Sequence, residues 1–359
     1  MNQNVYKKLA RKLDIIPYGF PETESGIELK LLAKIFTPEE AALASEMRLT
    51  PESAEQIARR TGRDSTKTSA LLEVMVQKGQ IEAVGEGEQR KFCLMPYLPG
   101  FYEEQLGRMD EELARLYEEY YPAFAKELLG KSPPYYKVIP VEKSIPVEVQ
   151  VFPYEQASAL LKKAKSFAVV KCICKVGKAL VGEPCEYPVE VCLWFSPTEG
   201  FFEDDPVTRV LTREEALQIL RESEEIGLIH SSINVREGHD FICNCCTCCC
   251  GIMRGISQLG MENSVAKSDF YVVVDPEMCI GCGTCVERCQ FGAPSIVDNT
   301  SRVDRKRCVG CGLCVTTCSS GARTLARKPE DQILPTPRDT EEWMRERAEN
   351  RGVSLEEIL

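Results

Sequence analysis

The sequence lacks a long apolar run, a signal-peptide pattern and an excess of basic charge. No segment reaches the roughly 20 apolar residues that a membrane span requires, and the first 20 residues have no apolar run behind their basic residues. We therefore expect a cytoplasmic protein without a membrane span. The net charge of −11 makes DNA an unlikely partner, because nucleic-acid binding needs a basic face that displaces counterions from phosphates.

Cysteine, in contrast, is abundant. The chain has 19 cysteines among 359 residues, and its 43% apolar content suffices for two or three globular domains. In a reducing cytoplasm so many thiols favour metal ligands or redox groups over disulfides. An acidic chain with many soft thiolates points to iron–sulfur chemistry.

An internal repeat near the C-terminus carries the clearest pattern. The stretches VDPEMCIGCGTCVERCQFGA and VDRKRCVGCGLCVTTCSSGA both read CxxCxxCxxxC, at an offset of 29 residues. Two-residue gaps let a chain curl around one cuboidal cluster with three thiolates, and the glycines let backbone N–H groups face the sulfides. The eight cysteines are Cys279, Cys282, Cys285, Cys289, Cys308, Cys311, Cys314 and Cys318.

Residues 270–327 thereby resemble the bacterial dicluster ferredoxins. The resemblance implies that the fourth cysteine of each run ligates the other cluster. One 4Fe-4S centre would use Cys279, Cys282, Cys285 and Cys318, and the second would use Cys308, Cys311, Cys314 and Cys289. Gln290 and Ser319 stand where the ferredoxins usually have proline, which bears on cluster potential. CxxC pairs also bind zinc, but two complete four-cysteine runs favour iron–sulfur clusters.

A second cysteine group lies in VVKCICKVGKALVGEPCEYPVEVCLWF. Its members are Cys172, Cys174, Cys185 and Cys192. We expect FAVVKCIC to be a buried strand with Cys172 and Cys174 on one face, GEPCEYP to be a turn and VEVCLWF to be the next strand. Four thiolates would then converge on a third cluster. The alternative is a set of small core residues that happen to be cysteine.

The third group is FICNCCTCCCG, which we expect to be a strand-to-helix turn. It contains Cys243, Cys245, Cys246, Cys248, Cys249 and Cys250. Sequence neighbours such as Cys245 and Cys246 cannot both point inward, so one cubane is unlikely to take all six. Four could bind one cluster, some could be shared with the Cys172 group, or a larger cluster could sit here. His230 is a possible extra ligand, although a hydrogen-bonded loop or core role is favoured. Cys93 stands alone and is expected to be a buried structural thiol.

The N-terminal third carries no metal pattern. We expect two amphipathic helices in residues 26–47, the second opened by a capping box of Thr37 and Glu40, followed by a helix capped by Thr50 and ended by Gly62, a further helix and a β-hairpin. This order of elements resembles a winged helix. Residues 26–95 contain ten Lys or Arg and eleven Asp or Glu, so protein docking or a structural role is favoured over DNA binding. Residues 101–130 read as a long acidic helix suited to a packing seam or a homo-oligomer contact, and a charged helix packing through Trp343 and Met344 ends the chain.

The predicted fold class is α+β: an N-terminal winged-helix-like domain, a middle α/β cysteine-rich domain and a C-terminal ferredoxin-like dicluster domain. The expected boundaries are 1–100 for the winged helix, 101–134 for a helical linker, 135–265 for the cysteine-rich domain, 266–330 for the dicluster domain and 331–359 for a helical tail. The order of these patterns is similar to a family of 4Fe-4S dicluster-domain proteins of anaerobic bacteria and archaea.

The resemblance implies electron transfer, and two function classes remain. The chain is expected to be an electron carrier or oxidoreductase subunit, with 4Fe-4S clusters as cofactors and a redox protein as partner. The alternative is a redox-sensing regulator that acts through the winged helix, and a weaker idea makes the site around CNCCTCCC catalytic. A sensor needs one labile cluster whereas a carrier needs several in a row, so the cysteine count favours the carrier.

Overall fold

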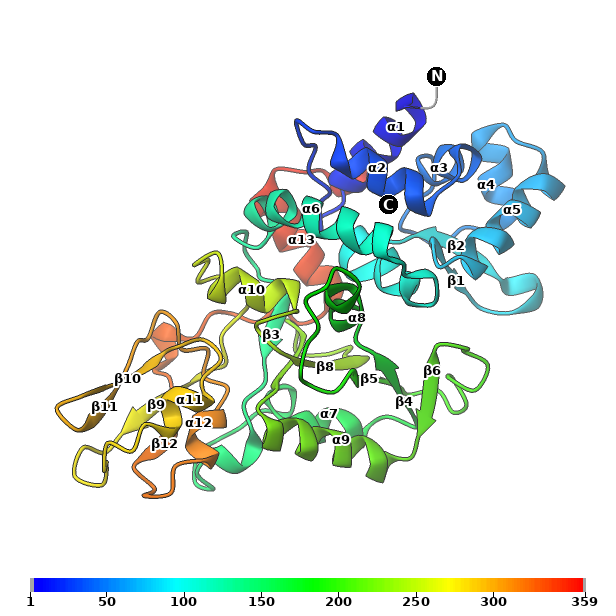
Figure 1. Cartoon of the computed structure of the whole chain (residues 1–359). Coiled ribbons are helices and arrows are strands. Elements are labelled where there is room, and N and C mark those ends of the chain that lie inside the picture. Colours follow the sequence, from blue (N-terminus) through cyan, green and yellow to red (C-terminus); the bar gives the residue numbers. More distant parts are fainter. Residues whose placement is uncertain (1–2, 358–359) are drawn as a thin grey trace. The chain divides into compact units, whose positions relative to one another are not determined.

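The protein divides into two compact units that interleave along the chain. A computed structural model describes residues 3–357 (Figure 1). Unit 1 comprises residues 1–128 with 344–359, and unit 2 comprises residues 129–343. Both units mix helices and strands, in agreement with the predicted α+β class. In the described part of the chain no helix is both long and apolar enough to cross a membrane.

Unit 1 is mainly helical. The second predicted helix begins where its capping box places it, with Thr37 and Glu40 each bonding the other's backbone N–H. The next helix is capped by Ser53, whose side chain accepts from the Gln56 N–H, so the prediction of Thr50 as the cap is wrong. Its elements are α1 (Gln3–Asp14), α2 (Ile27–Ile35), α3 (Pro38–Ala44), α4 (Ala54–Thr61), α5 (Ser65–Gln77), β1 (Ile81–Val84), β2 (Lys91–Leu94) and α6 (Glu111–Leu128).

The helix predicted for residues 101–130 starts later than expected. The side chain of Asp110 accepts a hydrogen bond from the backbone N–H of Leu113 (2.8 Å), and α6 begins only at Glu111. Residues 103–108 form a separate 3-10 helix. The buried face of α6 packs its aromatic side chains into the unit 1 core, where the ring of Tyr120 lies 5.0 Å from that of Phe20.

Unit 2 is built on one six-stranded sheet in the order β3-β7-β8-β5-β4-β6, and all the pairings are antiparallel. Helices α7 and α9 cover one face (Figure 1), where Leu161 and Leu220 pack against Phe167, Leu193 and Ile242 of the strands. The elements are β3 (Tyr136–Val138), α7 (Ala157–Lys162), β4 (Ser166–Lys171), α8 (Ile173–Leu180), β5 (Glu190–Ser196), β6 (Thr208–Leu211), α9 (Arg213–Ile226), β7 (Ile229–Ile233), β8 (Phe241–Cys245) and α10 (Gly251–Ser257).

The opposite face of this sheet carries cysteines. Side chains alternate between the two faces of a strand, and Leu193 and Ile242 belong to the core under α7 and α9. Cys192, Cys243 and Cys245 therefore point to the other face. The register pairs Leu193 with Ile242, and continuing it by one residue sets Cys192 opposite Cys243. The sheet thus has an apolar face and a thiol-rich face.

The repeat region consists of two two-stranded antiparallel sheets and two short helices. β9 (Phe270–Val274) pairs with β12 (Arg323–Arg327), and β10 (Pro294–Val297) pairs with β11 (Thr300–Val303). The helices are α11 (Thr284–Arg288) and α12 (Leu313–Thr316). The last helix, α13 (Thr340–Arg351), starts in unit 2, where Trp343 is buried and donates to the carbonyl of Pro134 (3.0 Å).

Candidate metal centres

The two cysteine runs of the repeat occupy equivalent positions. In each run the first two cysteines lie in a loop, the third lies on the short helix and the fourth follows it. Gly281 and Gly310 separate the first two cysteines with positive φ angles of 66° and 71°. A Cβ at Gly281 would meet the side chain of Asn299 at 2.3 Å, and one at Gly310 would meet the carbonyl of Phe270 at 2.3 Å. Glycine is thus required there on both steric and conformational grounds.

The fourth cysteine of the first run, Cys289, lies beside the cysteines of the second run. Cys289 interacts electrostatically with Cys308, and Cys311 interacts with Cys314, Cys289 and Cys308. In the other set Ser301 links two cysteines: its N–H donates to Cys279 Sγ (3.3 Å), and its hydroxyl contacts Cys285 Sγ (3.4 Å). The position of Cys289 agrees with the ligand exchange that the ferredoxin resemblance implies. The two ligand sets, including the place of Cys318 in the first, stay predictions.

Arg323 lies between the two sets and was not found from the sequence. It is 4% exposed, its Nη1 donates to Ser301 Oγ (2.7 Å) and its Nη2 donates to Cys314 Sγ (3.4 Å). Burial opposes its charge, but Cys314 and Cys285 outweigh burial and raise the pKa of Arg323. Its Nε is buried without a hydrogen-bond partner in residues 3–357. An inorganic sulfide fits such a donor, so the surroundings suit anionic clusters.

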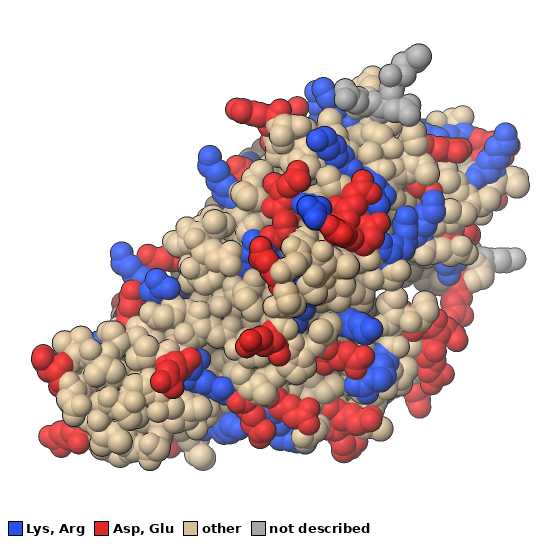
Figure 2. All heavy atoms as spheres, viewed as in Figure 1, with Lys and Arg blue, Asp and Glu red and all other residues tan. Residues whose placement is uncertain are grey.

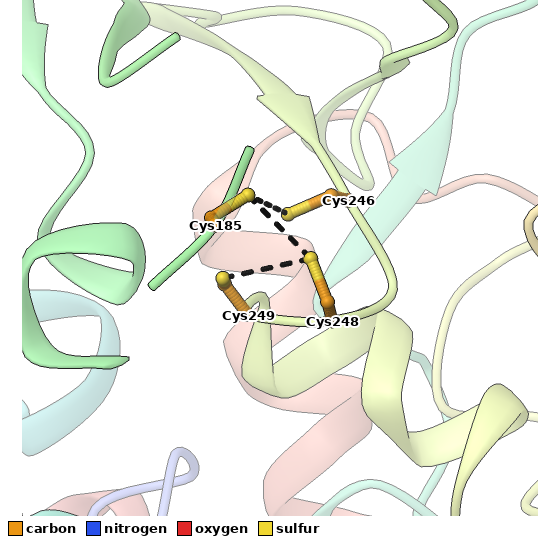
Figure 3. A group of neighbouring side chains, drawn as sticks. All are labelled: Cys185, Cys246, Cys248 and Cys249. Carbon is orange, nitrogen blue, oxygen red and sulfur yellow. Dashed lines mark hydrogen bonds between the residues drawn. The ribbon is translucent and has the colours of Figure 1, made fainter. Parts of the chain in front are cut away.

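A further four thiols converge in the middle of the chain (Figure 3). Cys185 comes from the loop between α8 and β5, and the other three come from the loop between β8 and α10. The four Sγ atoms lie within 4.8 Å of one another. Cys185 Sγ is 3.7 Å from Cys246 Sγ and 3.5 Å from Cys248 Sγ. We call this group, Cys185, Cys246, Cys248 and Cys249, the four-thiol site.

The four-thiol site favours at least one thiolate before any metal binds. The neighbouring thiol of Cys249 outweighs burial and lowers the pKa of Cys246 to about 5, with smaller help from Cys248 and Lys175. Cys248 is exposed, whereas Cys246 and Cys249 are buried. The group therefore offers four soft ligands, one of them open to solvent, which suits an iron–sulfur cluster.

The six other cysteines of the middle region contact one another in a separate set, which we call the six-thiol ring: Cys172, Cys174, Cys192, Cys243, Cys245 and Cys250. The sequence predicts Cys185 to lie with Cys172, Cys174 and Cys192, but it belongs to the four-thiol site instead. Adjacent residues separate as expected: Cys245 belongs to the ring and Cys246 to the four-thiol site.

The prediction that one strand includes both Cys172 and Cys174 is wrong. β4 ends at Lys171, Cys172 is the N-cap of α8, and Cys174 lies in the first turn of that helix. A β-bulge between Val170 and Lys171 marks the place where the strand leaves the ladder. The two thiols still interact, because a cap residue and the second residue of a helix lie close together.

His230 is a core residue. It is 1% exposed on β7, its Nδ1 lies 2.5 Å from Asn244 Oδ1 and its Nε2 lies 3.3 Å from Glu224 Oε1. Both ring nitrogens are used, which agrees with the favoured hydrogen-bonded role. Cys93 in unit 1 is likewise buried, and burial with Glu82 raises its pKa to about 12, as suits a structural thiol.

Lys175 provides a buried cation beside both middle cysteine groups, and sequence reasoning missed it too. The side chain is 1% exposed, and its Nζ donates to the carbonyl of Pro188 (2.7 Å). Its charge lowers the pKa of Cys172 in the six-thiol ring and of Cys246 in the four-thiol site. A positive charge here would offset part of the negative charge of thiolate-bound clusters.

Gln290 connects the repeat to the four-thiol site. It follows Cys289 directly and stands where the ferredoxins usually have proline. Its Oε1 accepts from the Thr247 N–H (2.8 Å), and its carbonyl accepts from the Thr247 hydroxyl (3.2 Å). Thr247 lies between Cys246 and Cys248. One residue thus joins a predicted ligand of the second ferredoxin cluster to the loop that holds the four thiols.

Comparison with known proteins identifies the repeat. The family described as 4Fe-4S binding domain matches residues 272–295 and 302–324, one match for each cysteine run. No curated protein and no solved structure matches the chain. The chain therefore contains two 4Fe-4S binding repeats of ferredoxin type, and 4Fe-4S clusters are its cofactors.

Proposed function

We propose that the protein is an electron carrier or a subunit of a redox enzyme, which passes electrons through its two ferredoxin-type clusters to a third centre at the four-thiol site. The 4Fe-4S binding repeats support electron transfer. The convergence of Cys185, Cys246, Cys248 and Cys249 supports the third centre.

The contact between Gln290 and Thr247 carries this proposal. It joins the end of the first ferredoxin cysteine run to the loop of the four-thiol site. Thr247 donates one hydrogen bond to the Gln290 side chain (2.8 Å) and one to the Gln290 carbonyl (3.2 Å). Arg288, on α11, makes a separate contact between the repeat and α9, where its guanidinium donates to the carbonyl of Glu225 (2.8 Å). The path from Cys289 to Cys246 or Cys248 therefore runs through bonded atoms and hydrogen bonds within unit 2.

The exposed Cys248 gives the route an outer end. A redox partner protein could approach the four-thiol site there, because the other thiols of the site are less accessible. Cys282, which is also exposed, lies in the ferredoxin repeat. Electrons could thus enter at one cluster and leave at another, as a carrier between proteins requires. A homo-oligomer contact through α6 also stays a prediction.

The change Cys248→Ala tests the third centre. A 4Fe-4S cubane has four thiolate ligands, and removal of one of them should prevent the cluster from being held. We therefore expect the anaerobically purified variant to lose about four irons per chain. The EPR signals of the ferredoxin pair should persist and show that unit 2 has folded. Cys93→Ala is the matched control and should retain all iron. An unchanged iron content in Cys248→Ala would contradict a cluster at this site.

The charges of unit 1 do not favour the alternative of a DNA-binding regulator. Arg60 Nε donates to Glu52 Oε1 (2.9 Å), and Arg63 pairs with Glu46 (3.3 Å), so two of the basic residues near the α4–α5 turn are already neutralised. Figure 2 shows Lys and Arg interspersed with Asp and Glu on the visible face. A structural or docking role for this unit is the better supported proposal.

A further inference from the structure

Six cysteines of unit 2 form a closed ring of thiol–thiol contacts. The Cys172 thiol contacts those of Cys174 and Cys192. Cys250 joins Cys174 to Cys245, and Cys243 joins Cys245 to Cys192. Each member thus touches two others, and none of the six belongs to the four-thiol site or to the 4Fe-4S binding repeats.

The fold builds this ring from two halves of three thiols. Cys192, Cys243 and Cys245 come from the thiol-rich face of the sheet, on the adjacent strands β5 and β8. Cys172 and Cys250 are the N-caps of α8 and α10, and Cys174 lies in the first turn of α8. One half is therefore set on rigid strands and the other on two helix starts.

The surroundings of the ring are those of metal ligands. The Tyr136 hydroxyl lies 3.7 Å from Cys243 Sγ, and the Ser231 hydroxyl lies 3.6 Å from Cys245 Sγ. The buried Lys175 adds a positive charge near Cys172. Hydroxyl donors and a cation stabilise thiolates, whereas a purely structural core of thiols needs neither. Six cysteines would also pack no better than alanine or valine in this place.

We propose that the six-thiol ring binds an iron–sulfur cluster larger than a cubane, with three thiolates on each of two linked halves. A single cubane takes four thiolates and two separate cubanes take eight. Six thiolates match two cubane-like halves that share an inorganic bridge in place of the missing ligands. The sheet half and the helix half of the ring each supply three thiols, which is the number that each cubane-like half would need.

This centre lies beyond the third cluster of the proposed function and does not depend on it. The two sites are adjacent: Cys245–Cys246 and Cys249–Cys250 are chain neighbours, and Cys172 and Cys174 pack against the core cluster that includes Cys246 and Cys249. Cys248, in contrast, contacts other members of the four-thiol site. Loss of iron in Cys248→Ala therefore reports on the four-thiol site, and loss of iron in a ring variant reports on the ring.

The test is iron and sulfide analysis with native mass spectrometry of the anaerobic full-length protein. The unsubstituted chain should carry about 20 irons: about twelve in three cubanes and about eight in the ring. Cys192→Ala, on the sheet half, and Cys174→Ala, on the helix half, should each lose about eight, while Cys93→Ala loses none. EPR signals of the ferredoxin pair serve as the folding control in each variant.

Two outcomes would overturn the proposal. About 16 irons in the unsubstituted chain, with a loss of about four in each ring variant, would show one ordinary cubane with two spectator thiols. The Cys248→Ala variant separates the ring from the four-thiol site, because its four-thiol site holds no cluster and Cys248 contacts none of the ring thiols. It should carry about 16 irons; about twelve would show an ordinary cubane in the ring, and about eight would show that the ring holds no cluster. This count decides between the outcomes even if every ring variant fails to fold.

Discussion

Replacing Arg323 by methionine is expected to lower the reduction potentials of the ferredoxin-type clusters by on the order of 100 mV. The guanidinium is buried and donates hydrogen bonds to Cys314 Sγ and Ser301 Oγ. Solvent therefore screens its charge only weakly from the clusters. A cation beside a cluster favours the reduced, more negative state. Its removal therefore makes reduction harder. An EPR-monitored redox titration measures the shift, with iron content checked in the same sample.

Two variants bracket this prediction. Arg323→Lys keeps a charge and should shift the potentials much less. Arg302→Met makes the same chemical change as Arg323→Met at an exposed position on β11, where solvent screens the charge. Equal shifts in Arg323→Met and Arg302→Met would mean that the buried position of Arg323 has no special influence on the clusters.

Replacing Gln290 by leucine is expected to slow electron exchange between the ferredoxin pair and the four-thiol site roughly tenfold, a usual size for loss of an outer-shell contact. The change removes the acceptor for the Thr247 N–H and the donor to the Gly227 carbonyl. The cysteines are untouched, so iron content should stay the same. Freeze-quench EPR after photoreduction, with less than one electron supplied per chain, follows the redistribution.

Ser319→Ala is the matched control for Gln290→Leu. Ser319 follows Cys318 as Gln290 follows Cys289, so the two positions are equivalent in the repeat. Ser319 is exposed, and the exchange rate should be unchanged in Ser319→Ala. If Gln290→Leu exchanged electrons as fast as the unsubstituted protein, the contact with Thr247 would not be the route.

The repeat could be read from the sequence because its ligands are local. Two-residue gaps and glycines fix the loops, so the spacing alone specifies the geometry around Gly281 and Gly310. The exchange of Cys289 and Cys318 between the two ligand sets is not a local property, and it is predicted only by the ferredoxin resemblance. Arg323 lies on β12, far along the chain from the cysteines of the first run, and only tertiary structure brings it beside them.

The middle cysteines show what spacing leaves undecided. The pattern FAVVKCIC predicts a strand that includes Cys172 and Cys174, but a bulge ends β4 and a helix begins. Cys185 sits on a loop whose path no local pattern specifies. The partition of ten thiols into a set of four and a set of six depends on the register of β5 against β8, which becomes visible only once the sheet order is known.

Iron and sulfide analysis of the unsubstituted protein, purified without oxygen, tests most directly whether clusters exist beyond the ferredoxin pair. The account predicts at least about twelve irons per chain with a matching amount of sulfide, since the repeat holds two cubanes and the four-thiol site a third. About eight irons per chain, or zinc in comparable quantity, would contradict it.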